Sequence, residues 1–118
     1  MSEIEEIVFT QCAPQIYDES WNADEPNAGC IKGYLYENTV YVVGERIFAN
    51  SNCSYMFAGE NSYGDHLWFN LKKIEGLELL DTSWAQDMKY MFAFSKMEEI
   101  YGISNWNVSN VKNFAAMF

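Results

Sequence analysis

The second half of the chain repeats its pattern of apolar and polar positions. Residues 74–92 (IEGLELLDTSWAQDMKYMF) and residues 100–118 (IYGISNWNVSNVKNFAAMF) align without a gap at an offset of 26 residues. A shorter copy, NCSYMF at residues 52–57, matches DMKYMF at residues 87–92. A period in the twenties is typical of stacked repeats, in which each unit buries its apolar side against its neighbours.

Each copy predicts a short strand, a polar corner and a helical return. Ile74, Leu77, Leu79 and Leu80 form a short apolar segment, as a brief strand would. The run 81–83 (Asp-Thr-Ser) offers acceptors for a turn or a helix N-cap. The return has apolar residues at i, i+3 and i+4, as one face of a short helix does. Those residues, and their counterparts in other copies, are expected in the core: Phe57, Met88, Met91, Phe92, Val108, Val111, Phe114, Met117 and Phe118.

The first fifty residues do not follow the repeat. Residues 6–10 (EIVFT) are strand-like, and residues 13–29 are polar and acidic, which predicts a loop or a short helical segment. Residues 30–36 and 39–43 are rich in β-branched and aromatic residues and flank Glu37-Asn38, which predicts a β-hairpin. Such a segment would cover the open end of the repeats.

These elements predict an α/β fold: a short leucine-rich-repeat-like solenoid behind an N-terminal cap that contains the β-hairpin. A length of 118 residues is that of one domain. Residues 1–50 form the acidic cap, and residues 51–118 form about two to three solenoid coils. The first coil carries extra residues, roughly 59–67. Because insertions in such repeats fall on loops, we expect these residues to form a loop.

The repeats resemble a known family. The segments LELLDTSWAQDMKYMF and ISNWNVSNVKNFAAMF resemble the unit of BspA-like leucine-rich-repeat proteins, and residues 47–59 (IFANSNCSYMFAG) resemble the lead-in to their first repeat. The matching positions are Gly76, Leu77, Leu80, Asp81, Thr82, Ser83, Asp87, Met88, Met91, Phe92, Gly102, Ile103, Trp106, Asn107, Ser109, Asn110, Val111, Asn113, Met117 and Phe118. The resemblance covers residues 47–118. It implies a non-enzymatic solenoid that binds proteins or host surfaces.

Charge changes the picture of the partners. The formal net charge is −10. Residues 1–45 hold nine acids and one base, Lys32. An anionic surface repels nucleic acid and anionic lipid and attracts basic protein surfaces. We therefore expect a protein partner with a basic surface, and neither direct nucleic-acid binding nor a membrane. The alternative is that the acids only keep the domain soluble.

The N-terminus and the cysteines bear on the compartment. The start MSEIEE has no secretory signal pattern, which predicts a cytoplasmic protein, or a cell-surface one if this is a fragment of a larger secreted protein. Cys12, Cys30 and Cys53 form no C-x-x-C motif, which favours thiols in a reducing compartment over one disulfide and one thiol. The only histidine, His66, has no cysteine at zinc-site spacing, so we expect neither a metal nor a cofactor.

Catalysis finds little support in the sequence. A lone histidine beside Asp65 is no catalytic triad, and no phosphate-binding glycine loop is present. Neighbouring acids such as Glu98-Glu99 are expected on a solvated face. We expect no enzyme.

The candidate partner-binding residues fall in two groups. Trp21 lies between acids in the first group, an arrangement typical of a hot spot for a basic partner, with packing on the cap as the alternative. The second group lies in the extra loop, with Trp68 just after it. Trp68 and Trp84 are expected to anchor loops, with contact to a partner as the alternative. The candidates are Asp18, Glu19, Trp21, Asp24, Glu25, Tyr63, Asp65, His66 and Trp68.

Two functions follow. The first is a non-enzymatic protein-binding module. The second is a small acidic inhibitor, similar in composition to phage anti-CRISPR proteins, that blocks a basic nucleic-acid channel of a nuclease. An uncovered last coil is apolar, so a homodimer through residues 100–118 is also expected.

Overall fold

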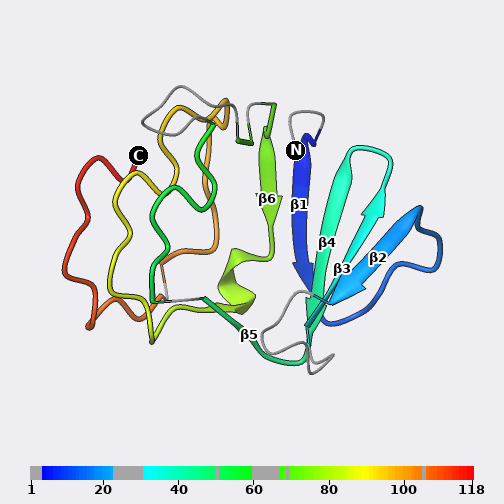
Figure 1. Cartoon of the computed structure of the whole chain (residues 1–118), viewed down its shortest axis with the longest axis horizontal. Helices are drawn as coiled ribbons and strands as arrows, with labels where there is room; N and C mark the ends of the chain where they lie inside the picture. The colour runs from blue at the N-terminus through cyan, green and yellow to red at the C-terminus, as the bar shows by residue number, and fades with distance from the viewer. Residues whose placement is uncertain (1–3, 23–30, 50, 60–66, 69, 105) are drawn as a thin grey trace.

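The computed structural model describes residues 4–22, 31–49, 51–59, 67–68, 70–104 and 106–118. A β-sheet occupies one side of the molecule, and a series of irregular turns occupies the other and holds the C-terminus (Figure 1). No helix among the described residues has the length and apolarity needed to cross a membrane.

The sheet has five strands in the order β2-β3-β4-β1-β6. Strand β3 pairs antiparallel with both β2 and β4, whereas β1 lies parallel to both β4 and β6. The strands are β1 (Glu6–Thr10), β2 (Glu19–Asn22), β3 (Ile31–Tyr36), β4 (Thr39–Gly44) and β6 (Lys73–Glu75). Strands β2 and β6 are therefore the two edges.

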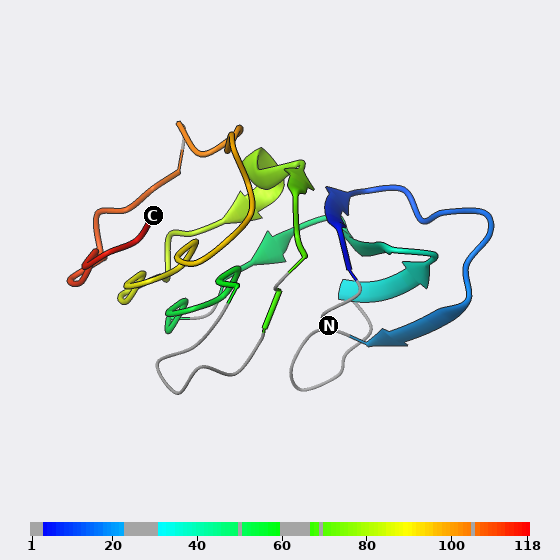
Figure 2. The ribbon, with the colours of Figure 1, turned by 90° about the horizontal axis from the view of Figure 1, so that it is seen from above.

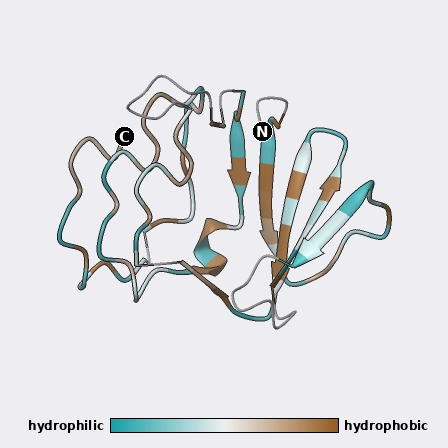
Figure 3. Cartoon of the chain, in the orientation of Figure 1, coloured by the Kyte–Doolittle hydropathy of each residue, from teal (hydrophilic) through white to brown (hydrophobic). Residues whose placement is uncertain are grey.

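Alternating burial explains the inner strands. In β1, Ile7 and Phe9 are buried, and Val40 of β4 and Ile74 of β6 lie in the same core. Figure 3 shows apolar residues along β1, β4 and β6. The predicted strand over residues 6–10 and the predicted hairpin are confirmed. The hairpin turn holds Glu37 at a φ of 54°, as the two-residue turns of hairpins require.

Strand β2 corrects the prediction of a loop or short helix over residues 13–29. All four of its residues are exposed, so the strand has no buried face that an alternation of apolar and polar residues could indicate. Pairing with β3 fixes the strand instead, with Trp21 opposite Gly33.

A short crossing joins the sheet to the repeats. Strand β5 (Ile47–Phe48) pairs in parallel with β7 (Leu80–Asp81), and the 3-10 helix η1 (Leu77–Leu79) comes just before β7. Gly76 precedes η1 at a φ of 81°, a conformation that favours glycine. It packs against the carbonyl oxygen of Phe9, where a Cβ would collide.

Three copies of the repeat lie side by side. We call residues 52–57 layer 1, residues 87–92 layer 2 and residues 113–118 layer 3, and the three together the repeat stack. Parallel bridges join Asn52 to Asp87 and Asp87 to Asn113. Seen from above, the three turns follow one another from the sheet toward the C-terminus (Figure 2).

Within the layers, backbone N–H groups donate to the following layer, whereas at the start of the copies the N–H groups of Asp87 and Lys112 donate the other way, to Ser51 and Gln86. In layer 1, the N–H groups of Cys53, Tyr55 and Phe57 donate to the carbonyl oxygens of Asp87, Lys89 and Met91 at 2.7–3.2 Å. In layer 2, the N–H groups at positions 88, 90 and 92 donate to the carbonyl oxygens at 113, 115 and 117 at 2.7–3.0 Å. Each layer therefore depends on its neighbour for its acceptors.

Within each layer the backbone forms turns and not a helix. The first residue accepts a bond from the backbone N–H two residues on, as in an Asx turn: Asp87 Oδ1 from Lys89 at 3.0 Å, with Asn52 and Asn113 in the same role. The fourth residue has a positive φ, between 48° and 59°, at Tyr55, Tyr90 and Ala116.

The predicted α/β solenoid with a strand, a corner and a short helix in each coil is therefore wrong. The described residues form a nearly all-β structure, in which η1 is the only helix and the returns of the repeats are turns. A positive φ at Tyr90 ends any helix, because successive helical residues need negative φ values. The predicted turn over residues 81–83 is present, since Ser83 donates its N–H to Asp81 Oδ1 at 2.9 Å.

An aromatic column links the two halves of the core. Phe9 of β1 meets Phe57 edge to face, with ring centroids 6.1 Å apart, and Phe57, Phe92 and Phe118 then stack at 5.5 and 5.6 Å. Met88 and Met91 are fully buried beside the column. The prediction of a buried core fails at the last copy, where Val108, Phe114 and Phe118 are exposed, because no described residues cover layer 3.

Candidate functional site

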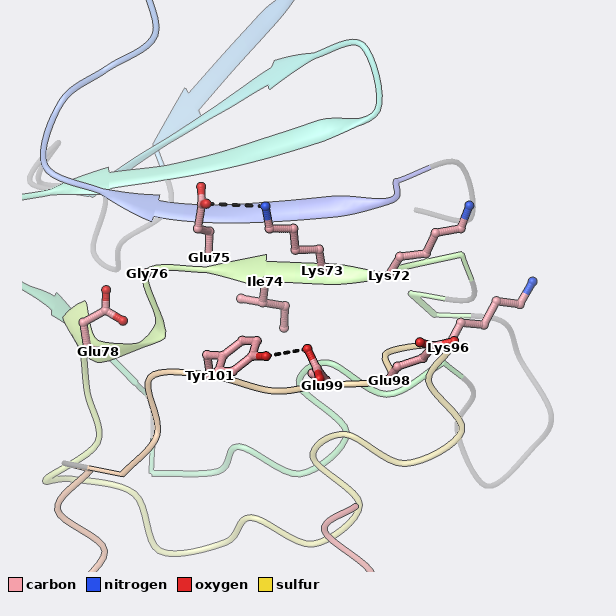
Figure 4. A pocket seen from close by; sticks show the side chains of 10 residues that line it. All are labelled: Lys72, Lys73, Ile74, Glu75, Gly76, Glu78, Lys96, Glu98, Glu99 and Tyr101. Atoms are coloured by element: carbon pink, nitrogen blue, oxygen red, sulfur yellow. Dashed lines mark hydrogen bonds and ion pairs between the residues drawn. The ribbon is translucent and has the colours of Figure 1, made fainter.

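A cleft of about 730 Å³ opens between strand β6 and the segment 96–101, which runs from layer 2 toward the last copy. Residues 72–76 form one wall, and residues of the segment 96–101 form the other. Glu78 stands at one end of the cleft, and Lys72 and Lys96 lie at the opposite end (Figure 4).

The wall formed by β6 is a strand edge. The N–H of Lys73 donates to the carbonyl oxygen of Glu5 at 3.2 Å, so the peptide groups of Lys73 face β1. Alternate residues of a strand direct their N–H and C=O groups to opposite sides, so those of Ile74 face the cleft. No backbone hydrogen bond joins β6 to the described segment 96–101. The cleft therefore offers a strand edge without a neighbouring strand.

The lysines of the cleft already have partners. Lys72 Nζ lies 2.9 Å from Glu5 Oε1, and this hydrogen bond, with the charge of Lys72, lowers the pKa of Glu5. Lys73 Nζ lies 3.5 Å from Glu75 Oε1, and Lys96 Nζ donates to Asn70 Oδ1 at 3.1 Å. The two ion pairs offset part of the positive charge of Lys72 and Lys73, whereas the neutral amide of Asn70 leaves the charge of Lys96 in place.

Three carboxylates of the cleft lack such compensation. In the described part of the chain, Glu78, Glu98 and Glu99 make no ion pair with lysine or arginine. Glu99 accepts a hydrogen bond from the Tyr101 hydroxyl, and that bond and the charge of Glu99 raise the pKa of Tyr101. The wall opposite β6 therefore combines negative charge with an aromatic ring that is 69% exposed.

The acidic group predicted from the sequence lies at the other edge of the sheet. Asp18 and Glu19 are exposed at the start of β2, and Asp18 Oδ2 accepts the N–H of Glu37 at 3.1 Å. The indole of Trp21 lies against Gly33 of β3 and stays 41% exposed. Packing and exposure are both present, so either interpretation of Trp21 stands. Asp24 and Glu25 lie outside the described residues.

The second predicted group is only partly described. Trp68 is half-buried, and its Nε1–H donates to the carbonyl oxygen of Met56 at 2.9 Å, as expected of a loop anchor. Trp84, expected to anchor a loop, is instead exposed. Tyr63, Asp65 and His66 lie outside the described residues, as does most of the predicted loop over residues 59–67.

Sequence reasoning missed the cleft. Glu98 and Glu99 are exposed, as expected of neighbouring acids, but the fold brings them opposite a strand edge. The strand lies more than twenty residues earlier in the chain, so no local pattern joins the two walls. The nearest signal was Tyr101, an aromatic residue close to an acidic pair in a segment between copies.

The repeat region is similar to one known family. The sequence profile of the family described as "Mycoplasma protein of unknown function, DUF285" matches residues 51–118. The match covers more than half of the chain and includes all three layers and the segment 96–101. No curated protein and no solved structure is similar enough to the chain to count as a match.

Proposed function

We propose a function from the premise that this chain belongs to the DUF285 family of Mycoplasma proteins of unknown function: it is a non-enzymatic protein-binding module. Its ligand is an extended segment of a partner protein that carries basic side chains. The segment lies in the cleft as a strand beside β6. We also propose the finer assignment to BspA-like repeat proteins, which Asp87, Met91 and Phe92 support.

One observation carries the proposal: the cleft joins the strand edge at Ile74 to carboxylates that have no cationic partner. Main-chain hydrogen bonds to a strand edge give a peptide affinity without dictating its sequence. Side-chain charges then select the sequence, because Glu78, Glu98 and Glu99 favour lysine or arginine. The overall charge of −10 attracts a basic segment from a distance.

The test is a selection of displayed random peptides on the full chain, followed by affinity measurements on the best binder. We expect enrichment of lysine and arginine and an affinity that falls with salt. A variant with Glu78→Gln, Glu98→Gln and Glu99→Gln should bind about tenfold or more weakly, since each carboxylate contributes roughly 0.5–1 kcal/mol.

The opposite sheet edge provides the matched control. A variant with Asp18→Asn and Glu19→Gln loses charge beside β2 and should change the affinity less than about twofold. In the bound peptide, every second backbone amide should face β6. N-methylation of these amides should abolish binding, whereas N-methylation of the amides between them should not. The cleft would be the wrong site if the β2 variant alone weakened binding, or if neither pattern of N-methylation mattered.

A further inference from the structure

We propose that the cleft can close on itself: residues 98–101 pair in parallel with β6 and extend the five-stranded sheet by one strand. This inference rests on the proposed function, because the closed form occupies the strand edge that the partner segment needs. The chain thus blocks its own binding site, and a partner must displace residues 98–101 in order to bind.

The sequence repeat continues into both walls of the cleft. At the offset of 26 residues that relates the two copies, residues 71–77 (LKKIEGL) align with residues 97–103 (MEEIYGI). The segment opposite β6 is therefore the counterpart of β6 in the next copy. Figure 4 shows that the two run in the same direction along the cleft. Equivalent segments of stacked repeats lie side by side, and closure would give these two that arrangement.

The two walls already meet at one end of the cleft. Gly102 has a φ of 89°, as Gly76 has a φ of 81°, and a Cβ on Gly102 would lie 3.0 Å from the backbone nitrogen of Glu78. Trp106 donates its Nε1–H to the carbonyl oxygen of Leu77 at 2.9 Å. These contacts hold the end of the segment beside η1. Closure therefore requires only the residues before Gly102 to move toward β6.

The backbone groups of the two walls match in this register. In the parallel pairing of β1 with β6, the N–H of Lys73 donates to the carbonyl oxygen one residue before its partner in β1. The same geometry lets Ile74 donate its N–H to the carbonyl oxygen of Glu99 and accept the N–H of Tyr101. Neither bond is present between these described residues in the open form that the structure shows.

The charged side chains match as well. Lys72 Nζ lies 2.9 Å from Glu5 Oε1, and closure places Glu98 on the other side of the same lysine. Lys73, which lies 3.7 Å from a carboxylate oxygen of β1, would in the same way gain Glu99 as a second neighbour. Opposite charges on directly opposite residues stabilise strand pairing. Closure thus gives both carboxylates a cationic partner.

The apolar residues form a matching row. Ile7 of β1 is directly opposite Ile74 of β6, and both are buried. Ile100 is half-buried and packs against the same core. Closure places Ile100 beside Ile74, so the new strand keeps isoleucine on the core side.

The closed form removes the features that the partner segment uses. It occupies the N–H and C=O groups of Ile74, and it pairs Glu98 and Glu99 with lysines of the same chain. The apparent affinity for a partner falls with the fraction of molecules that are open. A lysine-rich segment competes best, because its side chains replace Lys72 and Lys73 beside these carboxylates.

A disulfide across the closed pair tests the closure without a ligand. Lys73→Cys and Glu99→Cys, in a full chain with Cys12→Ser and Cys30→Ser, place two thiols directly opposite each other in the proposed pairing. Oxidised glutathione should link them, and mass spectrometry follows the rate. Lys73→Cys with Glu98→Cys is the matched control, because adjacent residues of a strand point to opposite faces. This pair should link about tenfold or more slowly.

The contribution of charge is tested in the same variant. Adding Glu98→Lys places a positive charge opposite Lys72 and should slow the linking of positions 73 and 99 about threefold or more. Glu19→Lys makes the same change of charge on the exposed strand β2 and should leave the rate unchanged. Equal slowing by both substitutions would contradict the pairing of charges across the cleft.

Peptide binding separates the closure from the proposed function. The probe is a short peptide of alternating lysine and valine, which the linked variant should bind about tenfold or more weakly than the same variant after reduction. Equal linking of the two cysteine pairs, or linking that leaves peptide binding unchanged, would overturn the closure. Linking as expected with no peptide binding in either redox state would instead overturn the proposed function and support the closure.

Discussion

The five-stranded sheet and the repeat stack satisfy their backbone groups in different ways. In the sheet, neighbouring strands exchange bonds through regular ladders in both orientations. In the stack, N–H groups donate to the next layer, while the carbonyl oxygens of Met88 and Tyr90 accept the N–H groups of Met91 and Ala93 in local turns. The stack therefore has a direction, and each layer contacts only its neighbours, as in other repeat structures.

The difference extends to the side chains. The sheet core uses aliphatic residues such as Ile7 and Val40 on alternating positions. The stack places one Phe per layer in a column and needs an Asx turn and a positive φ in every layer to keep the Phe residues aligned. Substitutions should thus act locally and by layer in the stack.

The largest effect is expected in the middle layer. Met91 is fully buried between two layers, so Met91→Ala should lower the free energy of unfolding by about 2–5 kcal/mol through the cavity it leaves. Met117 takes the same position in layer 3, which contacts a single layer among the described residues, so Met117→Ala should cost less, roughly 1–2 kcal/mol. Urea unfolding measures both. Equal losses of unfolding free energy in the two variants would show that contact with neighbouring layers does not set the stability of a layer.

The junction between sheet and stack should be nearly as sensitive. Gly76→Ala places a Cβ against the carbonyl oxygen of Phe9 and requires a φ of 81°, so we expect a loss of about 2–4 kcal/mol. Thermal unfolding followed by circular dichroism gives the value. A loss under about 1 kcal/mol would mean that the sheet and the stack are not rigidly joined here.

The stability of the fold should depend on pH through the Cys53 thiol. Burial first, and then the charge of Asp87, raise the pKa of Cys53 to about 11 from an ordinary value of 9.0. The folded state holds this proton more tightly than the unfolded state, so the stabilisation is complete below pH 9 and is lost as the pH rises from 9 toward 11.

The expected loss between these pH values is about 2–3 kcal/mol. Urea unfolding of the native chain and of Cys53→Val between pH 8 and 11 isolates this group, since other titrating residues are common to both. The stability difference between the two proteins should shrink as the pH rises. A constant difference would contradict the shifted pKa.

A smaller effect is expected at the Asx turns. Asp87→Ala removes the acceptor for the N–H of Lys89 and should cost about 1 kcal/mol. Asp87→Asn keeps an acceptor, as Asn52 and Asn113 do in the other layers, and should stay within about 0.5 kcal/mol of the native chain. If both variants lost the same stability, the charge of Asp87 and not the turn would be responsible.

The smallest effect has the opposite sign. Ala116 is exposed at a φ of 48°, so Ala116→Gly should stabilise the chain by about 0.5–1 kcal/mol by relieving backbone strain. The neighbouring Ala115→Gly has no such strain to relieve and should destabilise by a similar amount. Thermal unfolding of the two variants should therefore shift the midpoint in opposite directions. Two shifts of the same sign would contradict the conformation of layer 3.

Local sequence determined the elements whose neighbours lie close in the chain. The strand at residues 6–10 and the hairpin around Glu37-Asn38 followed from alternation and a polar turn. The matching of residues 52–57, 87–92 and 113–118 also followed, because a repeat is visible without a structure. The burial of Met88, Met91 and Phe92 followed from their apolar spacing.

The tertiary structure decided the rest. Apolar residues at i, i+3 and i+4 are compatible with a helix and equally with a pair of turns. A glycine at position 90 would have indicated a positive φ, whereas the tyrosine there does not. Strand β2 exists only because β3 pairs with it, and the cleft exists only because the segment 96–101 returns beside β6. Both depend on contacts between residues distant in sequence, which residue patterns along the chain do not record.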